Sequence, residues 1–213
     1  MDLETRNSKP WPERSRRLET RNSEEWDRLA EALNRYGIRH VAPGGPPRGR
    51  IPSDPAELFS ELDRASSVRL QEAVIFLLLT YPELAPAAQA AIEGLDGVRR
   101  DKAMRKYVAA CALQRMWRTR IALALGPRPL IPPAFLDEFS LPSLEEDYGR
   151  ATLLALAADE EACYGYHAWA GYTSLMDLFL REIELRRWGQ PTLGVGGWGL
   201  GPLRQSPIPN PRR

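Results

Sequence analysis

The stretch VRRDKAMRKYVAACALQRMWRTRIALAL, residues 98–125, is the longest helical pattern in the chain and decides the fold class. Gly97 precedes it and Gly126-Pro127 follows it, and both are signals that bound a helix. A helix that is apolar on more than one side usually lies at the centre of a bundle, and we expect that position here. Its apolar residues form one face of Met104, Tyr107, Val108, Cys111, Ile121 and Leu125, and a second of Leu113, Met116 and Leu123.

Shorter helical patterns lie on both sides of this central helix. Each has a capping residue or a proline in its first turn, or apolar residues at helical spacing. The sequence therefore predicts an all-α domain, an orthogonal or solenoid-like bundle of about six to seven helices. The flanking helices are expected to begin near Ser53 or Asp54, Val68, Glu83, Phe135, Ser143 and Ala168.

The ends of the chain differ from this core in composition. LETRNS occurs twice near the N-terminus, at residues 3–8 and 18–23, and we expect residues 1–22 to form a polar, disordered, repeat-derived tail. Residues 23–42 predict an amphipathic helix that Asn22 or Ser23 caps and Gly37 ends, followed by a short extended segment. The remaining segments are a Pro/Gly linker at 43–53, a helical core at 54–188 and a disordered Gly/Pro-rich tail at 189–213.

Charge and cysteine content exclude several classes of protein. The chain has 29 basic and 28 acidic residues, so no global field draws it to nucleic acid or to an anionic membrane. Its two cysteines, Cys111 and Cys163, are too few for a disulfide scaffold and are typical of a reducing compartment, so we expect a cytoplasmic protein. The longest apolar run, residues 73–79, is far shorter than the roughly 20 residues that span a bilayer.

Basic residues near the start of the central helix are candidates for binding nucleic acid. They are Arg99, Arg100, Lys102, Arg105 and Lys106. At about 100° per residue they spread around the helix, whereas a surface that follows phosphates is normally one-sided. Acidic residues at 137–138, 145–147 and 159–161 could neutralise them from neighbouring helices. Nucleic-acid binding is therefore the alternative function and not the leading one.

A resemblance concerns WDRLAEALNRYGIRHVAPGG, residues 26–45. This stretch resembles the opening of minimal nucleotidyltransferase folds of the toxin type, in which a helix leads into a short strand and a Gly-Gly turn. The resemblance implies a pair of carboxylates that holds magnesium ions, but Asp54 stands alone after the turn and Glu57 lies inside the next predicted helix. A degraded nucleotidyltransferase is thus a second alternative. The helical remainder resembles the all-α companion proteins of two-component toxin systems.

Two further spacings suggest chemistry. Arg35 and His40 match the Arg-x4-His spacing of HEPN ribonucleases, which would make His40 a general base. Cys163 and His167 could share one helical face, but two ligands do not make a zinc site. The sequence predicts no complete catalytic set, no metal site and no cofactor.

The leading hypothesis is a non-catalytic helical interaction protein, either an accessory subunit or the neutralising partner of an enzyme. It depends on the balanced charge, the missing catalytic set and aromatic residues that could anchor an interface. The residues predicted to contact a protein partner are Trp26, Leu29, Leu33, Trp117, Trp169 and Tyr172.

Overall fold

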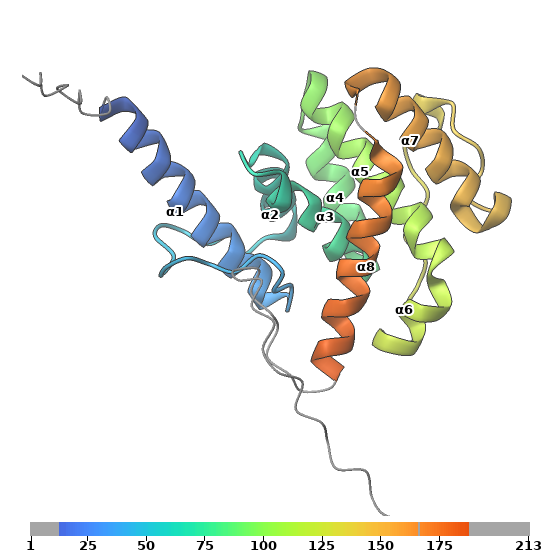
Figure 1. Cartoon of the computed structure of the whole chain (residues 1–213), viewed down its shortest axis with the longest axis horizontal. Helices are drawn as coiled ribbons and strands as arrows, with labels where there is room; N and C mark the ends of the chain where they lie inside the picture. Colours follow the sequence, from blue (N-terminus) through green and yellow to red (C-terminus); the bar gives the residue numbers. More distant parts are fainter. Residues whose placement is uncertain (1–12, 166, 188–213) are drawn as a thin grey trace, which may run out of the picture.

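The computed structural model describes residues 13–165 and 167–187, and this part of the chain forms helices and no strand (Figure 1). The all-α prediction is confirmed for the described residues. Eight α-helices are present there, against six to seven predicted, and three short 3-10 helices lie in the connections. The α-helices are α1 (Glu13–Arg35), α2 (Pro55–Arg64), α3 (Val68–Thr80), α4 (Ala85–Glu93), α5 (Gly97–Met116), α6 (Arg118–Leu125), α7 (Arg150–Tyr164) and α8 (Ala168–Arg187).

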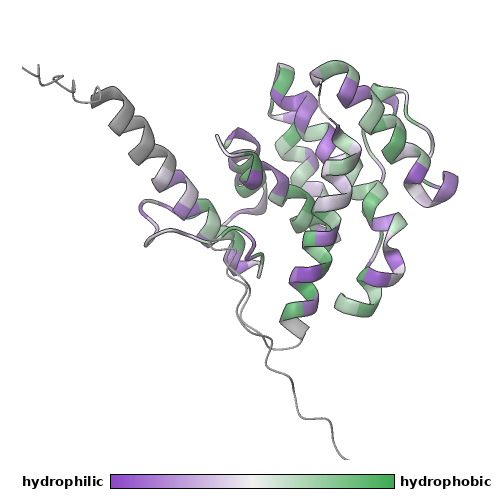
Figure 2. Cartoon of the chain, viewed as in Figure 1, coloured by the Kyte–Doolittle hydropathy of each residue, from purple (hydrophilic) through white to green (hydrophobic). Residues whose placement is uncertain are grey.

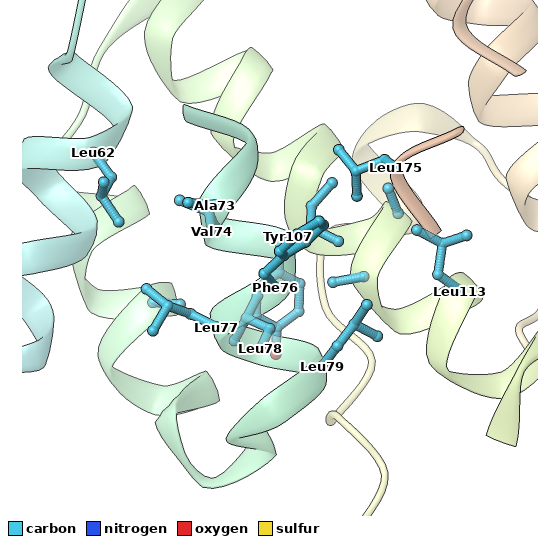
Figure 3. Packing of buried hydrophobic residues seen from close by; sticks show 14 of the residues in the cluster. Leu62, Ala73, Val74, Phe76, Leu77, Leu78, Leu79, Tyr107, Leu113 and Leu175 are labelled. Atoms are coloured by element: carbon cyan, nitrogen blue, oxygen red, sulfur yellow. The ribbon is translucent and has the colours of Figure 1, made fainter. Parts of the chain in front are cut away.

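The centre of the core is formed by α3 and α5, which pack against each other. All residues from Ala73 to Thr80 are buried on α3, and all residues from Tyr107 to Gln114 are buried on α5. Figure 3 shows buried side chains of α3, such as Phe76 and Leu78, and Tyr107 of α5 within this core. The predicted central position of the helix within residues 98–125 therefore holds for α5.

The other helices surround this pair. α2 packs on α3 and α4, α7 packs on α5, and α8 packs on α6 and α7. Hydrophilic and hydrophobic residues alternate along α8, as an amphipathic helix at the edge of a core requires (Figure 2). No single helix among the described residues is long and apolar enough to cross a membrane, although the bent pair Val68–Thr80 and Pro82–Glu93 passes that test by length and composition.

α1 begins earlier than the sequence predicts. Its first residue is Glu13, so Asn22 and Ser23 lie inside the helix and do not cap it. Residues 13–22 contain neither proline nor glycine, so a helix through them has only a small unfavourable free energy from intrinsic propensity. The disorder predicted for residues 1–12 and 189–213 lies outside the described residues. Figure 1 shows the N-terminal half of α1 extending away from the other helices.

The segment after α1 is a loop that contacts α1, and residues 38–42 do not form the short extended segment that the sequence suggests. Gly37 ends the helix with φ 71°, as expected. No strand forms over residues 38–42, because the chain turns there. The linker is then tied to α1, since Gly44 N–H donates to Asp27 Oδ1 at 2.6 Å and Trp26 Nε1 donates to the Ala42 carbonyl at 2.9 Å.

Two further helix boundaries differ from the prediction. The helix over residues 98–125 is interrupted at Trp117 (φ −107°, ψ 18°), where α5 ends and α6 begins. The helix expected from Ser143 starts only at Arg150. Before it, Asp147 and Tyr148 adopt φ 45° and 54° inside the 3-10 helix η3 (Glu146–Gly149), and these angles cannot continue an α-helix.

Candidate functional site

A pocket of 410 Å³ lies between the N-terminal halves of α3 and α8, and α5 and α7 also contribute to its lining. α3 and α8 meet where Phe76 contacts Phe179, with ring centroids 5.3 Å apart, and the pocket lies toward the N-terminal end of both helices from that contact. We call it the α3–α8 pocket. Its apolar and aromatic lining consists of Val68, Ile75, Ala168, Gly171, Tyr172 and Leu175. Its polar lining consists of Gln71, Glu72, Lys102, Lys106, Glu160 and His167.

The pocket is exposed at its rim and buried at its base. At the rim, Val68 is 64% exposed, and a Cβ built on Gly171 would meet no atom within 4 Å. At the base, Ile75 is 1% exposed and Leu175 is 9% exposed. A group that enters the pocket therefore passes from solvent into an environment largely removed from water. Such concave sites with apolar walls and a few polar groups are typical of ligand-binding sites.

One cation of the pocket is already paired inside the protein. Lys106 Nζ donates to Asp63 Oδ1 at 3.0 Å, and the Asp63 side chain is only 2% exposed. Breaking this pair would leave a buried aspartate without its counter-ion, which is costly. Lys106 is thus held by α2 and is not free to follow a phosphate backbone.

Two carboxyl groups line the pocket, of which Glu160 is buried and Glu72 is half-buried. Burial raises the pKa of Glu72 against the opposing charges of His40, Lys106 and Arg69. Burial also raises the pKa of Glu160, although its Oε1 accepts a hydrogen bond of 2.9 Å from the Tyr172 hydroxyl. Carboxyl groups with raised pKa in a concave pocket are frequent features of functional sites.

A second buried polar pair lies beside this pocket, around Phe76. The His40 ring packs on the Phe76 ring with centroids 4.2 Å apart, and its Nδ1 lies 3.4 Å from Glu182 Oε2. Glu182 Oε1 accepts a hydrogen bond of 2.5 Å from the backbone N–H of Arg39. The loop after α1 therefore contacts α8 through Glu182, which lies close to both the Arg39 backbone N–H and the His40 ring.

The two residues of the HEPN-like spacing are not brought together by any described contact. The His40 side chain is 7% exposed and is directed to Phe76 and Glu182, whereas Arg35 Nε lies 4.0 Å from Glu31 on its own helix. A general base must reach a substrate proton, and a histidine this deeply buried has little access to one. The ribonuclease assignment stays a prediction without support from this geometry.

The five basic residues predicted to bind nucleic acid divide into two groups. Arg99 and Lys102 are exposed and Arg100 is half-buried, whereas Arg105 and Lys106 are directed inward. Arg105, 5% exposed, donates to Asp101 at 2.8 Å and to Asp159 at 2.5 Å. The predicted neutralisation from a neighbouring helix is thus confirmed for Asp159 on α7.

The six residues predicted to contact a partner have mixed positions. Leu29 and Leu33 are fully buried in the protein's own core. Trp26, Trp117 and Trp169 are half-buried against that core. Only Tyr172, which is 8% exposed, lies in the α3–α8 pocket. The apolar face of α1 packs on the protein's own core, and Leu29 and Leu33 are therefore not accessible to a partner. A surface that contacts a partner must lie elsewhere on the molecule.

The described residues contain no group of three or more His, Cys, Asp or Glu side chains that could hold a metal ion. His167 Nδ1 lies 2.9 Å from Glu161, and Cys163 is exposed nearby in sequence. Burial raises the pKa of the Cys111 thiol to about 12, which makes it a poor nucleophile at neutral pH.

Sequence reasoning missed Glu72 as a site residue and considered Glu160 only as a neutralising charge. A signal for both was present. Glu72 shares a helical face of α3 with Val68, Ile75 and Leu79, and Glu160 follows Leu153 and Leu156 at the spacing of the buried face of α7. Polar residues at apolar positions of a helix are candidates for a buried site.

No family model, no curated protein and no solved structure matches this chain in the three comparisons with known proteins.

Proposed function

We propose that the protein is a non-catalytic binding module, an accessory subunit whose α3–α8 pocket receives a side chain of a partner protein. The observation that carries this proposal is the pocket itself. It is continuous from the exposed Val68 to the buried Leu175, and both residues offer apolar contact to an incoming group. A pocket that accepts one anchor side chain is the usual centre of a protein interface.

The polar groups that line the α3–α8 pocket favour binding over catalysis. Lys106 has a fixed ionic partner in Asp63, and Glu160 accepts a hydrogen bond from the neutral Tyr172 hydroxyl. The pocket lining contains no cysteine, serine or threonine among the described residues, so it lacks a nucleophile of the kind that hydrolases activate with a histidine. Nucleic-acid binding is less favoured, because Arg105 and Lys106 are paired internally.

The remaining finer assignments are proposals of the same kind. A role as the neutralising partner of an enzyme fits a binding module. Two free cysteines, Cys111 and Cys163, favour a cytoplasmic location. An orthogonal bundle is favoured over a solenoid, because the chain bends by 114° between α3 and the following helical segment Pro82–Glu93.

The experiment blocks the pocket. A phage-displayed library of random linear peptides is selected on the immobilised full chain, and the enriched peptides are then tested by fluorescence anisotropy on two variants. Gly171→Trp fills the pocket from a position where a side chain meets open space, whereas Ala170→Trp places the same ring at the neighbouring exposed position, outside the pocket lining. Circular dichroism checks that both variants keep the helical fold.

We expect enriched peptides to bind the wild type and Ala170→Trp equally, and to lose at least about tenfold in affinity on Gly171→Trp. Failure to enrich any peptide, or undiminished binding to Gly171→Trp, would refute the proposed function.

A further inference from the structure

We infer that the anchor taken by the α3–α8 pocket is a basic side chain, a lysine or arginine of the partner, with Glu72 and Glu160 as its counter-ions. This inference rests on the proposed function and adds the chemistry of the group that is recognised. Apolar lining residues such as Ile75 and Leu175 would contact the methylene stem, and the carboxylates would meet the charge.

The distribution of charge in the pocket is the first support. The pocket has two lysines and two glutamates, but only Lys106 has an ion-pair partner, whereas Lys102 is exposed to solvent. Lys106 is paired with Asp63 at 3.0 Å, and Lys102 lies over the Tyr164 ring, 5.1 Å from its centroid. Among the described residues, neither Glu72 nor Glu160 forms an ion pair. The two carboxyl groups of the lining therefore have no direct ion pair, although the charges of His40, Lys106 and Arg69 act on Glu72 and those of Arg105 and Lys106 act on Glu160.

The partial removal of the glutamates from water is the second support, since Glu72 is half-buried and Glu160 is buried. Glu160 is 6% exposed, and its one described hydrogen bond comes from the neutral hydroxyl of Tyr172. Burial disfavours the ionised form of both carboxyl groups, as the raised pKa of Glu72 and of Glu160 shows. A bound cation would stabilise the ionised carboxylates, and that stabilisation is available only when the pocket is filled.

The third support is the shape of the lining. A lysine or arginine side chain has a long apolar stem and a charged end, and it gains most where apolar walls surround the stem. Gly171 provides room at the rim, since no atom lies within 4 Å of the position that a Cβ would take there. An anionic anchor such as a phosphate would instead bring its charge toward Glu72 and Glu160, and like charges repel.

The test uses the peptides enriched on the full chain. Each lysine or arginine of a peptide is replaced in turn by norleucine, which keeps an apolar stem and removes the charge. Affinities are measured on the wild type and on the double variant Glu72→Gln/Glu160→Gln, in which amides of nearly the same shape replace the carboxyl groups. Thermal unfolding of the double variant checks that it is folded.

We expect one basic residue whose replacement weakens binding to the wild type at least about tenfold and weakens binding to the double variant much less. Peptides that need Gly171 unobstructed but tolerate norleucine everywhere would overturn this inference and leave the proposed function standing. An equal loss on the wild type and on the double variant would also overturn it, because the cation would then be recognised elsewhere. Peptides indifferent to Gly171→Trp would overturn the proposed function itself.

Discussion

Two glycines of this protein show how position decides the effect of one methyl group. Gly149 precedes α7 with φ 86°, and a Cβ there would lie 3.0 Å from the Ala112 carbonyl oxygen and 3.1 Å from the Ala112 Cα. Gly171 lies in the first turns of α8, and a Cβ there would meet no atom within 4 Å. The first glycine permits close packing of the chain on α5, whereas the second only adds backbone freedom.

The same substitution should therefore have opposite effects at these two positions. We expect Gly149→Ala to lower the free energy of unfolding by roughly 1–3 kcal/mol, because the backbone is strained and the contact with Ala112 is too close. Gly171→Ala should raise it by about 0.5–1 kcal/mol, because alanine restricts the unfolded chain and favours the helix. Urea denaturation of both variants measures the two values. Equal effects would contradict this account of Gly149.

Arg105 is the most heavily engaged basic residue of α5. Its guanidinium contacts Asp101 and Asp159 and lies over the Phe139 ring, 4.4 Å from its centroid. We expect Arg105→Ala to lower the free energy of unfolding by about 2–3 kcal/mol, less than for a fully buried pair, because Asp101 and Asp159 are partly exposed and can be solvated. Arg99→Ala, at an exposed position, should change it by less than about 0.5 kcal/mol. Urea denaturation compares the two variants.

The internal pairing of Arg105 and Lys106 also determines how nucleic-acid binding should be tested. Charge reversal at either residue would break internal pairs, and a loss of binding would then report damage to the fold. Reversal at the exposed Arg99 and Lys102 avoids that ambiguity.

At the scale of the element, α5 holds the proline-rich loop at residues 127–136 through its polar side chains. Gln114, 2% exposed, donates through Nε2 to the Pro129 carbonyl at 2.9 Å and accepts the Ile131 N–H at 2.7 Å. The Tyr107 hydroxyl donates to the Pro132 carbonyl at 2.9 Å. Prolines cannot supply backbone N–H groups, so a loop of this composition depends on side chains of its neighbour.

Removal of the Gln114 amide should release this loop. We expect Gln114→Leu to lower the free energy of unfolding by about 2–3 kcal/mol, because two hydrogen bonds are lost and the buried Ile131 N–H is left without its acceptor. Hydrogen exchange at Ile131 should accelerate more than exchange in the helices. Gln89→Leu removes a single bond, to the Tyr107 hydroxyl, and should cost less. An unchanged rate of hydrogen exchange at Ile131 in Gln114→Leu would contradict the role of Gln114 in holding this loop.

The sequence predicts the helices of this fold better than it predicts their ends. Helix stops with a specific local signal, such as Gly37 at the end of α1, are found correctly. The break at Trp117 has no proline or glycine to announce it. Likewise, Tyr148 has a positive φ without the glycine that would normally indicate it. Such conformations depend on tertiary packing, which local signals do not contain.

At the scale of the whole molecule, the candidate site depends on contacts between distant segments. Lys106 on α5 reaches Asp63 on α2, and Glu182 on α8 reaches His40 in the loop after α1. Composition and helical period show that Glu160 lies on a buried face, but they cannot show which residue it meets there. The sequence therefore predicts the elements that form the pocket and not the pocket.

The pH dependence of stability tests whether the buried glutamates act as the structure indicates. Burial raises the folded-state pKa of Glu72 and of Glu160 above the ordinary value of 4.5. Between that value and the raised pKa, the folded protein holds protons that the unfolded chain has released, so stability falls as the pH rises. The contribution of these groups is thus fully present below pH 4.5 and is lost as the pH passes the raised values.

Glutamine has no carboxyl group to titrate, so the double variant Glu72→Gln/Glu160→Gln should lack this dependence. We expect its free energy of unfolding, relative to the wild type, to increase steadily as the pH is raised from acid to neutral and then to level off. Urea denaturation of both proteins across this range isolates the two glutamates, because every other titrating group is common to both. If the difference in free energy of unfolding between the variant and the wild type is constant with pH, or decreases, the two carboxyl groups are solvated or already paired. The hypothesis of unpaired negative charge in the α3–α8 pocket would then be wrong.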